Sequence, residues 1–324
     1  MADDKKESKP SEITKGIFDS TTLKNLKFKN RVFLGPCIHT APKIEKIVEN
    51  DVSMVTTEGC IIGDYAFTKL QPEGPFRIDT DEYIPEIKNL ADIVHKNKSY
   101  ILLDLLHQGI GSCEHYTPSG GKGILNLDIE TKAMSKDDII KVQNYYVQAA
   151  LRAKKAGCDG VEIHGAQLSL PSLFCSSKYN TRTDEYGGSE ENRARFIVEI
   201  LQKIREAIGN DMIISAKIDN PTEEHGFTEN GFITTAKALQ KAGLDIIEVS
   251  GPNPHRNGDD PYFYKDTKKI AEILNIPVIC IGGIKSYEQI EFILKDSKIQ
   301  YVAMARELLK QPDIIKQWYN NKKK

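Results

Sequence analysis

Eight short apolar segments, repeated along the chain, constrain its fold more than any other feature of the sequence. Each is rich in β-branched residues and largely apolar on both faces, which is typical of strands in a parallel sheet covered on both sides. Longer amphipathic stretches separate them, and Ser135 and Ser189 stand where helix N-caps are expected. The predicted strands cover residues 31–36, 52–59, 99–107, 159–164, 212–219, 244–251, 276–283 and 299–306.

This alternation predicts an α/β fold, a (β/α)8 TIM barrel, because eight strand–helix units fit a chain of 324 residues and such barrels usually need about 250 residues. A doubly wound sheet is the second choice, but no GxGxxG motif follows the first strand. Residues 20–30 predict a short N-terminal hairpin that covers the bottom of the barrel. We expect residues 1–12 to form a disordered polar tail and residues 13–324 a single barrel domain.

The composition narrows the partners and the compartment. A formal net charge of −2 gives no argument for nucleic acid as the main partner, and no run of about 18 apolar residues predicts a membrane span. The six cysteines lack CxxC spacing, so we expect no metal site and reduced thiols in a cytoplasmic protein. Trp318 and Tyr319 leave two interpretations open, a contact between copies in a homo-oligomer or packing within one copy.

The carboxyl ends of the strands are where a barrel of this kind carries its active site. Side chains alternate between the two faces of a strand, so apolar positions facing the helices leave their neighbours facing the barrel axis. This alternation predicts that the inward positions near three strand ends are Asp104, Glu162, His164, Ser215 and Lys217. The strand ends therefore supply a carboxylate, an imidazole and an ammonium group to one region.

The last two predicted strands end in a pattern suited to an anion. Gly282 and Gly283 allow backbone N–H groups to approach a ligand closely, and Arg306 follows Ala305 at the end of the neighbouring strand. This is the usual phosphate position of such barrels. A tight turn followed by a surface arginine is the alternative interpretation.

Several longer stretches identify a family. They resemble, in order along nearly the whole chain, the signature segments of the old yellow enzyme family of flavin oxidoreductases. The stretches are "LKFKNRVFLGP" (26–36), "HGAQ" (164–167), "RTDEYGGSEENRARF" (182–196), "KALQKAGLDIIEVSG" (237–251), "IPVICIGGIKS" (276–286) and "VAMARELLKQPDIIKQW" (302–318). Each is weak alone, and their combination is specific.

The resemblance implies an FMN-dependent oxidoreductase, a flavoprotein that takes hydride from NADH or NADPH and passes it through flavin N5 to a small acceptor. The acceptor classes are an enone, a quinone, a nitro compound or oxygen. Carried over by position, the residues at the ends of the first three predicted strands border the flavin ring, and Lys217 lies near flavin N1 and O2. The residues at the ends of the last two predicted strands hold the phosphate. The cofactor-binding residues implied are Pro36, Cys37, Gly59, Asp104, Lys217, Gly282, Gly283, Ala305 and Arg306.

The same resemblance implies the catalytic residues. His164 and Gln167 match the pair that hydrogen-bonds the oxygen of the acceptor, although His164 capping its strand is the structural alternative. Ser169 stands where the family has a tyrosine that protonates carbon, and a serine hydroxyl is a poor acid at neutral pH. Other hydroxyl or imidazole groups on strand-end loops are candidates for that proton: His39, Tyr65, Tyr116, Tyr262 and Tyr264.

A further departure concerns the flavin edge. The family usually has glutamine where this chain has Asp104, and Ile38 replaces a residue that often hydrogen-bonds the flavin. One hypothesis is that Asp104 pairs with Lys217, partly neutralises it and lowers the reduction potential. Together with Ser169, these changes also leave open a degenerate flavin barrel that binds a ligand or partner without catalysis.

Overall fold

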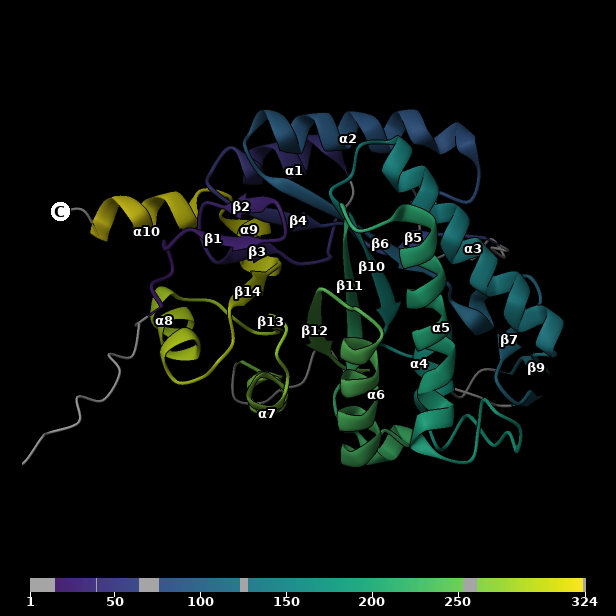
Figure 1. Cartoon of the computed structure of the whole chain (residues 1–324). Helices are drawn as coiled ribbons and strands as arrows, with labels where there is room; N and C mark the ends of the chain where they lie inside the picture. The colour runs from purple at the N-terminus through teal and green to yellow at the C-terminus, as the bar shows by residue number, and fades with distance from the viewer. Residues whose placement is uncertain (1–14, 39, 64–75, 123–127, 253–260, 323–324) are drawn as a thin grey trace, which may run out of the picture.

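Eight parallel strands form a closed barrel in the computed structural model, which describes residues 15–38, 40–63, 76–122, 128–252 and 261–322 (Figure 1). Each strand pairs with the next along the chain, and the last pairs with the first. All eight coincide with the segments predicted from the sequence, with β10 ending one residue beyond its predicted segment, so the predicted barrel is confirmed. The strands are β3 (Val32–Leu34), β4 (Met54–Thr56), β6 (Tyr100–Leu106), β10 (Gly160–Gly165), β11 (Ile213–Asp219), β12 (Ile246–Ser250), β13 (Val278–Ile281) and β14 (Tyr301–Met304).

Helices lie between successive strands and surround the barrel (Figure 1). Ser135 begins α3 with a capping box, in which its hydroxyl and the Asp138 carboxylate each accept from the backbone of the other residue. Ser189 caps α5 by accepting from the backbone N–H of Asn192. The helices are α1 (Ala41–Val48), α2 (Ile84–Lys96), α3 (Lys136–Lys155), α4 (Leu170–Cys175), α5 (Glu190–Ile208), α6 (Glu229–Lys241), α7 (Tyr264–Ile273), α8 (Tyr287–Lys295), α9 (Arg306–Lys310) and α10 (Ile314–Lys322).

The apolar side chains form an outer layer and an inner layer. Val161 and Ile163 belong to the large core between strands and helices, as their alternation with Glu162 predicts. At the amino ends of the strands, Phe33 and Tyr301 stack inside the barrel with a ring separation of 4.6 Å. Inward polar residues begin above this apolar layer, at Glu162 on β10 and Ser215 on β11, and continue toward the carboxyl ends.

The N-terminal hairpin closes the bottom of the barrel. Strands β1 (Thr21–Leu23) and β2 (Leu26–Phe28) pair antiparallel, and the ring of Phe28 packs against Phe33, Tyr100 and Tyr301. The predicted hairpin is confirmed. The expected boundary between a disordered tail and the barrel stays a prediction, because residues 1–14 lie outside the described ranges.

Smaller elements extend the strand ends. Strand β5 (Cys60–Ile61) adds to β6, and β7 (Tyr116–Thr117), β8 (Gly121–Lys122) and β9 (Glu130–Ala133) form a small sheet beyond it. Single 3₁₀ turns occupy Asp81–Tyr83, Gly109–Gly111 and Glu223–His225. Across the described ranges, every helix is too short or too polar to cross a membrane.

The aromatic residues near the C-terminus pack within the molecule. The ring of Trp318 meets Tyr287 edge-on at 6.2 Å, and Tyr319 meets Phe18 at 5.1 Å. These contacts support the interpretation that Trp318 and Tyr319 pack within one copy of the chain. A homo-oligomer stays a prediction.

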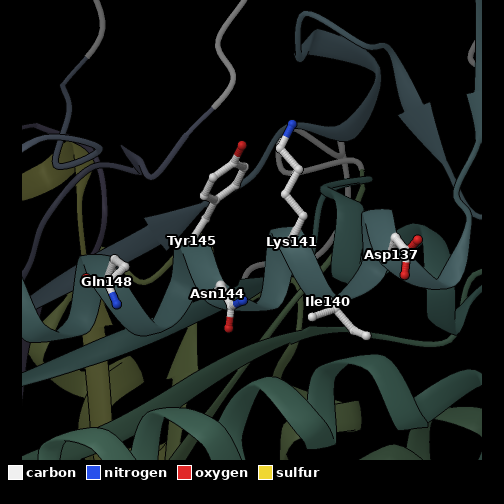
Figure 2. Close-up of a pocket in the computed structure, with 6 residues that line it drawn as sticks. All are labelled: Asp137, Ile140, Lys141, Asn144, Tyr145 and Gln148. Atoms are coloured by element: carbon white, nitrogen blue, oxygen red, sulfur yellow. The ribbon is translucent and has the colours of Figure 1, made fainter.

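A hollow of about 500 Å³ lies outside the barrel on α3. Figure 2 shows Lys141 and Tyr145 projecting to the same side of this helix. None of the predicted site residues line this hollow, so it is separate from the strand ends. Its lining residues are Asp137, Ile140, Lys141, Asn144, Tyr145 and Gln148.

Candidate active site

A cavity of about 820 Å³ lies at the carboxyl ends of the barrel strands. Every residue predicted to bind the cofactor or the acceptor lines it, although these residues come from seven of the eight strands and the loops after them. The structure therefore brings the predicted residues together in one place. They are Pro36, Cys37, Gly59, Asp104, His164, Gln167, Ser169, Lys217, Gly282, Gly283, Ala305 and Arg306.

Charged side chains from four neighbouring strands meet inside the barrel next to this cavity. Lys217 Nζ lies 3.1 Å from Asp104 Oδ2 and 3.0 Å from Glu162 Oε1. Glu248 Oε1 is 3.7 Å from the same ammonium group. His164 Nδ1 is 2.8 Å from Asp104 Oδ2. We call this group the barrel cluster: Asp104, Glu162, His164, Lys217 and Glu248.

Strand register explains why these side chains meet. Parallel pairing sets Glu162 beside Asp104 and His164 beside Lys217, and it sets Lys217 beside Glu248. The proposed pairing of Asp104 with Lys217 is confirmed. Glu248 was not among the predicted inward residues, although the same alternation would have found it, because Ile247 and Val249 face the outer core.

Burial and mutual charge set the protonation of the barrel cluster. Burial raises the pKa of Asp104, but His164 and Lys217 outweigh it and hold the pKa below its usual value. Burial lowers the pKa of Lys217, and the three carboxylates more than reverse this, so the group stays an ammonium. Burial and the nearby Glu162 charge raise the pKa of Glu248 to about 8. Burial likewise raises the pKa of Glu162 above its ordinary value.

A strained turn follows His164. Gln167 and Leu168 have φ angles of 58° and 62°, which side-chain-bearing residues rarely adopt. Asp219 Oδ1 accepts from the Gln167 backbone N–H at 2.8 Å, and Ser172 Oγ accepts from that of Leu168 at 3.2 Å. Burial raises the pKa of Asp219 to about 6. This turn directs Gln167 into the cavity, where its amide donates to Ser250 Oγ at 3.3 Å.

Ser169 lines the cavity, but its hydroxyl is engaged. Its Oγ donates to the backbone carbonyl of His164 at 2.7 Å, and the side chain is buried. The hydroxyl hydrogen that a proton donor would use is therefore committed to the main chain. Sequence alone did not indicate this contact, which joins the turn back to the end of its own strand.

The tyrosines considered as proton donors point elsewhere. Tyr116 donates to Asp138 at 2.7 Å, and its burial and that bond raise its pKa to about 12. Tyr264 donates to Asp296. Neither these two nor Tyr262 line the cavity. His39 and Tyr65, the other two candidates, lie outside the described residues.

The cavity walls fit a bound flavin mononucleotide. Asp104 Oδ1 is buried without a hydrogen-bond partner among the described residues, so an acceptor is left for an imide N–H. Gly282 and Gly283 have φ angles of 98° and 72°, and a Cβ on Gly282 would lie 2.7 Å from the Phe263 ring. Arg306 stands beside this turn and donates to the Tyr262 hydroxyl at 3.3 Å. One end of the cavity thus offers an unpaired carboxylate oxygen and the other a glycine turn with a cation.

Cys37 contacts the cavity as a protonated thiol. Burial and the neighbouring Glu58 charge raise its pKa to about 12. A thiol in this state is a poor nucleophile, in agreement with the expectation of a contact residue.

Comparison with known proteins identifies the family of the chain. Residues 16–324 match the family described as NADH:flavin oxidoreductase / NADH oxidase. NADPH dehydrogenase of Clostridium acetobutylicum is 30% identical over 322 residues, which cover 92% of this chain and 93% of that protein. Among solved structures, morphinone reductase is 25% identical with a TM-score of 0.81, covering 96% of this chain and 91% of its own. Histamine dehydrogenase from Rhizobium sp. 4-9 shares the fold at 23% identity and a TM-score of 0.84, and this chain spans 48% of its length.

Proposed function

The chain belongs to the NADH:flavin oxidoreductase / NADH oxidase family, an FMN-dependent NAD(P)H oxidoreductase of the old yellow enzyme type, and we propose that the cavity of about 820 Å³ is its active site. FMN supplies the redox chemistry when bound, because it accepts hydride from NADH or NADPH and delivers it to an acceptor. The observation that carries the assignment is the convergence of every predicted site residue on one cavity at the strand ends.

The barrel residues would hold the cofactor from three sides. Pro36, Cys37 and Gly59 would border the ring, and Asp104 Oδ1 would accept from its imide N–H. Lys217 would supply positive charge at the pyrimidine edge, where electrostatic stabilisation of a reduced ring is needed. The phosphate would lie at the glycine turn, held by backbone N–H groups and a guanidinium: Gly282, Gly283, Ala305 and Arg306.

His164 and Gln167 would hold the acceptor. Both reach the cavity from the strand end and the strained turn that follows it. An imidazole and an amide there can hydrogen-bond one oxygen of an enone, a quinone or a nitro compound. We place the enzyme in the cytoplasm, with its cysteines as free thiols, with no nucleic acid or membrane partner and with a homo-oligomer left open.

The binding part is tested by spectrophotometry with a matched glycine pair. Gly282→Ala should weaken FMN binding at least tenfold, because the added methyl would meet the Phe263 ring and disturb the turn. Gly157→Ala is the control, since it shares a positive φ of 85° but has nothing within 4 Å of an added methyl. Wild-type protein should be yellow and should bleach with NADPH or NADH under anaerobic conditions. A colourless protein that FMN neither binds nor stabilises would contradict the proposal.

A further inference from the structure

His164 enters the cavity with one ring nitrogen already engaged. Its Nδ1 lies 2.8 Å from Asp104 Oδ2, and an ionised carboxylate can only accept, so Nδ1 carries a hydrogen. A neutral imidazole has one N–H group, and in His164 that group would donate its hydrogen bond to Asp104. Nε2 has no hydrogen-bond partner among the described residues. It can donate to an acceptor oxygen only when the ring is an imidazolium.

The charges around His164 favour that form. Asp104 and Glu162 both contact the Lys217 ammonium group. The Asp104, Glu162 and Lys217 side chains are all buried, so these charges are only weakly screened by solvent. Asp219, on the same side as the strained turn, also acts on the imidazole. A hydrogen bond from His164 to Asp104 adds to the pairing of these buried carboxylates, which are costly when unpaired.

Two hydroxyl groups considered for this role are engaged elsewhere. Ser169 donates to the backbone carbonyl of His164 itself. Tyr116 donates to Asp138 away from the cavity. His164, like Lys217, combines a hydrogen bond to Asp104 with a place in the cavity wall, and its imidazole has a second ring nitrogen that can carry a proton.

We propose that His164 acts as an imidazolium acid that gives its Nε2 proton to the oxygen of the acceptor, and that Asp104 is the positioning residue that keeps the ring in this form. This rests on the proposed function. The acceptor takes two electrons and one hydrogen as hydride, supplied by NADH or NADPH through the cofactor, and one proton from His164. The Nε2–H bond breaks, an O–H bond forms, and the ring keeps its Nδ1 hydrogen on Asp104 until solvent returns the lost proton.

This assignment selects an acceptor class. A quinone gains hydride and one proton to become a hydroquinone, and that proton goes to oxygen. An enone needs its proton at carbon, where the chain offers Ser169 with its hydroxyl already engaged. Quinones and related acceptors that end as O–H products are therefore favoured over enones.

The first test observes the ring directly by nitrogen NMR of ¹⁵N-histidine-labelled protein, with and without FMN. The His164 signals are assigned by their loss in His164→Gln. In wild type, both ring nitrogens should be protonated at neutral pH, and in Asp104→Asn the ring should be neutral there. A neutral wild-type ring, or the same titration in both proteins, would overturn the proposal. Because the apoprotein is also measured, a failure to bind FMN would count against the proposed function alone.

A second histidine–aspartate pair gives the matched control. His95 Nε2 lies 2.8 Å from Asp159 Oδ2 at the amino end of the barrel. Neither residue lines the cavity. Asp159→Asn should shift the titration of His95 and leave that of His164 in place. This control separates the effect of the Asp104 carboxylate on His164 from a general effect of removing a carboxylate from the protein.

The second test follows reoxidation of the reduced holoenzyme by a quinone across pH in a stopped-flow instrument. The wild-type rate should fall with rising pH, approaching about tenfold per pH unit once the ring loses its Nε2 proton. In Asp104→Asn the fall should begin at lower pH, and in Asp159→Asn it should match wild type. A flat wild-type profile, or one that Asp104→Asn does not move, would refute the role of Asp104.

Discussion

Glu248 makes a sharp prediction about how stability depends on pH. Its carboxyl is buried, and the pKa rises from an ordinary 4.5 to about 8 in the folded chain. Between these values the folded protein binds more protons than the unfolded one, so stability falls as pH rises through this window. Each pH unit is worth at most about 1.4 kcal/mol. Glu248→Gln removes the titration and should therefore stabilise the protein at pH 8 by about 2–5 kcal/mol relative to its effect at pH 5.

Urea unfolding of the cofactor-free protein at several pH values between 5 and 8 measures this difference. Glu272→Gln is the control, because Glu272 is an exposed carboxylate on α7 paired with Lys298 at 3.2 Å. Its effect should stay within about 0.5 kcal/mol at every pH. If Glu248→Gln and wild type lose stability with the same slope toward pH 8, the reasoning from burial and the Glu162 charge is refuted.

Two further predictions concern charge pairs at the two ends of the barrel. Lys217→Met should destabilise the apoprotein by about 3–5 kcal/mol in urea unfolding near neutral pH, because it leaves buried carboxylates without their cation; a loss below about 1 kcal/mol would contradict the ion pairs seen here. At the other end, the hydrogen bond from Asp159 raises the pKa of His95 above its ordinary 6.5, so its stabilisation is complete below pH 6.5 and is lost as pH rises through the folded value. Urea midpoints of His95→Gln and wild type should therefore converge at alkaline pH, and a constant difference would argue against the charge interaction.

The position of the site could be predicted from the sequence, because in a barrel it follows from where the strands lie and from the alternation of side chains along each strand. A strand residue faces inward or outward according to its own number along the strand. This is why His164 and Lys217 could be placed on the inner side, and why the glycines after β13 and Arg306 after β14 could be assigned to the same cavity. Ser135 and Ser189 could be predicted as helix N-caps for a similar reason, since a helix cap depends on residues only a few positions away.

Tertiary structure decided which groups share a proton. Asp104 Oδ2 accepts from His164, 60 positions along the chain, and from Lys217, 113 positions along. Glu248 approaches Lys217 from a further strand, and Ser169 turns its hydroxyl to a backbone carbonyl. The alternation of side chains along each strand predicts that these groups face the barrel interior. The register between distant strands and the local backbone decide which atoms are in contact. Those contacts direct Nδ1 of His164 to Asp104, while the residue lines the cavity.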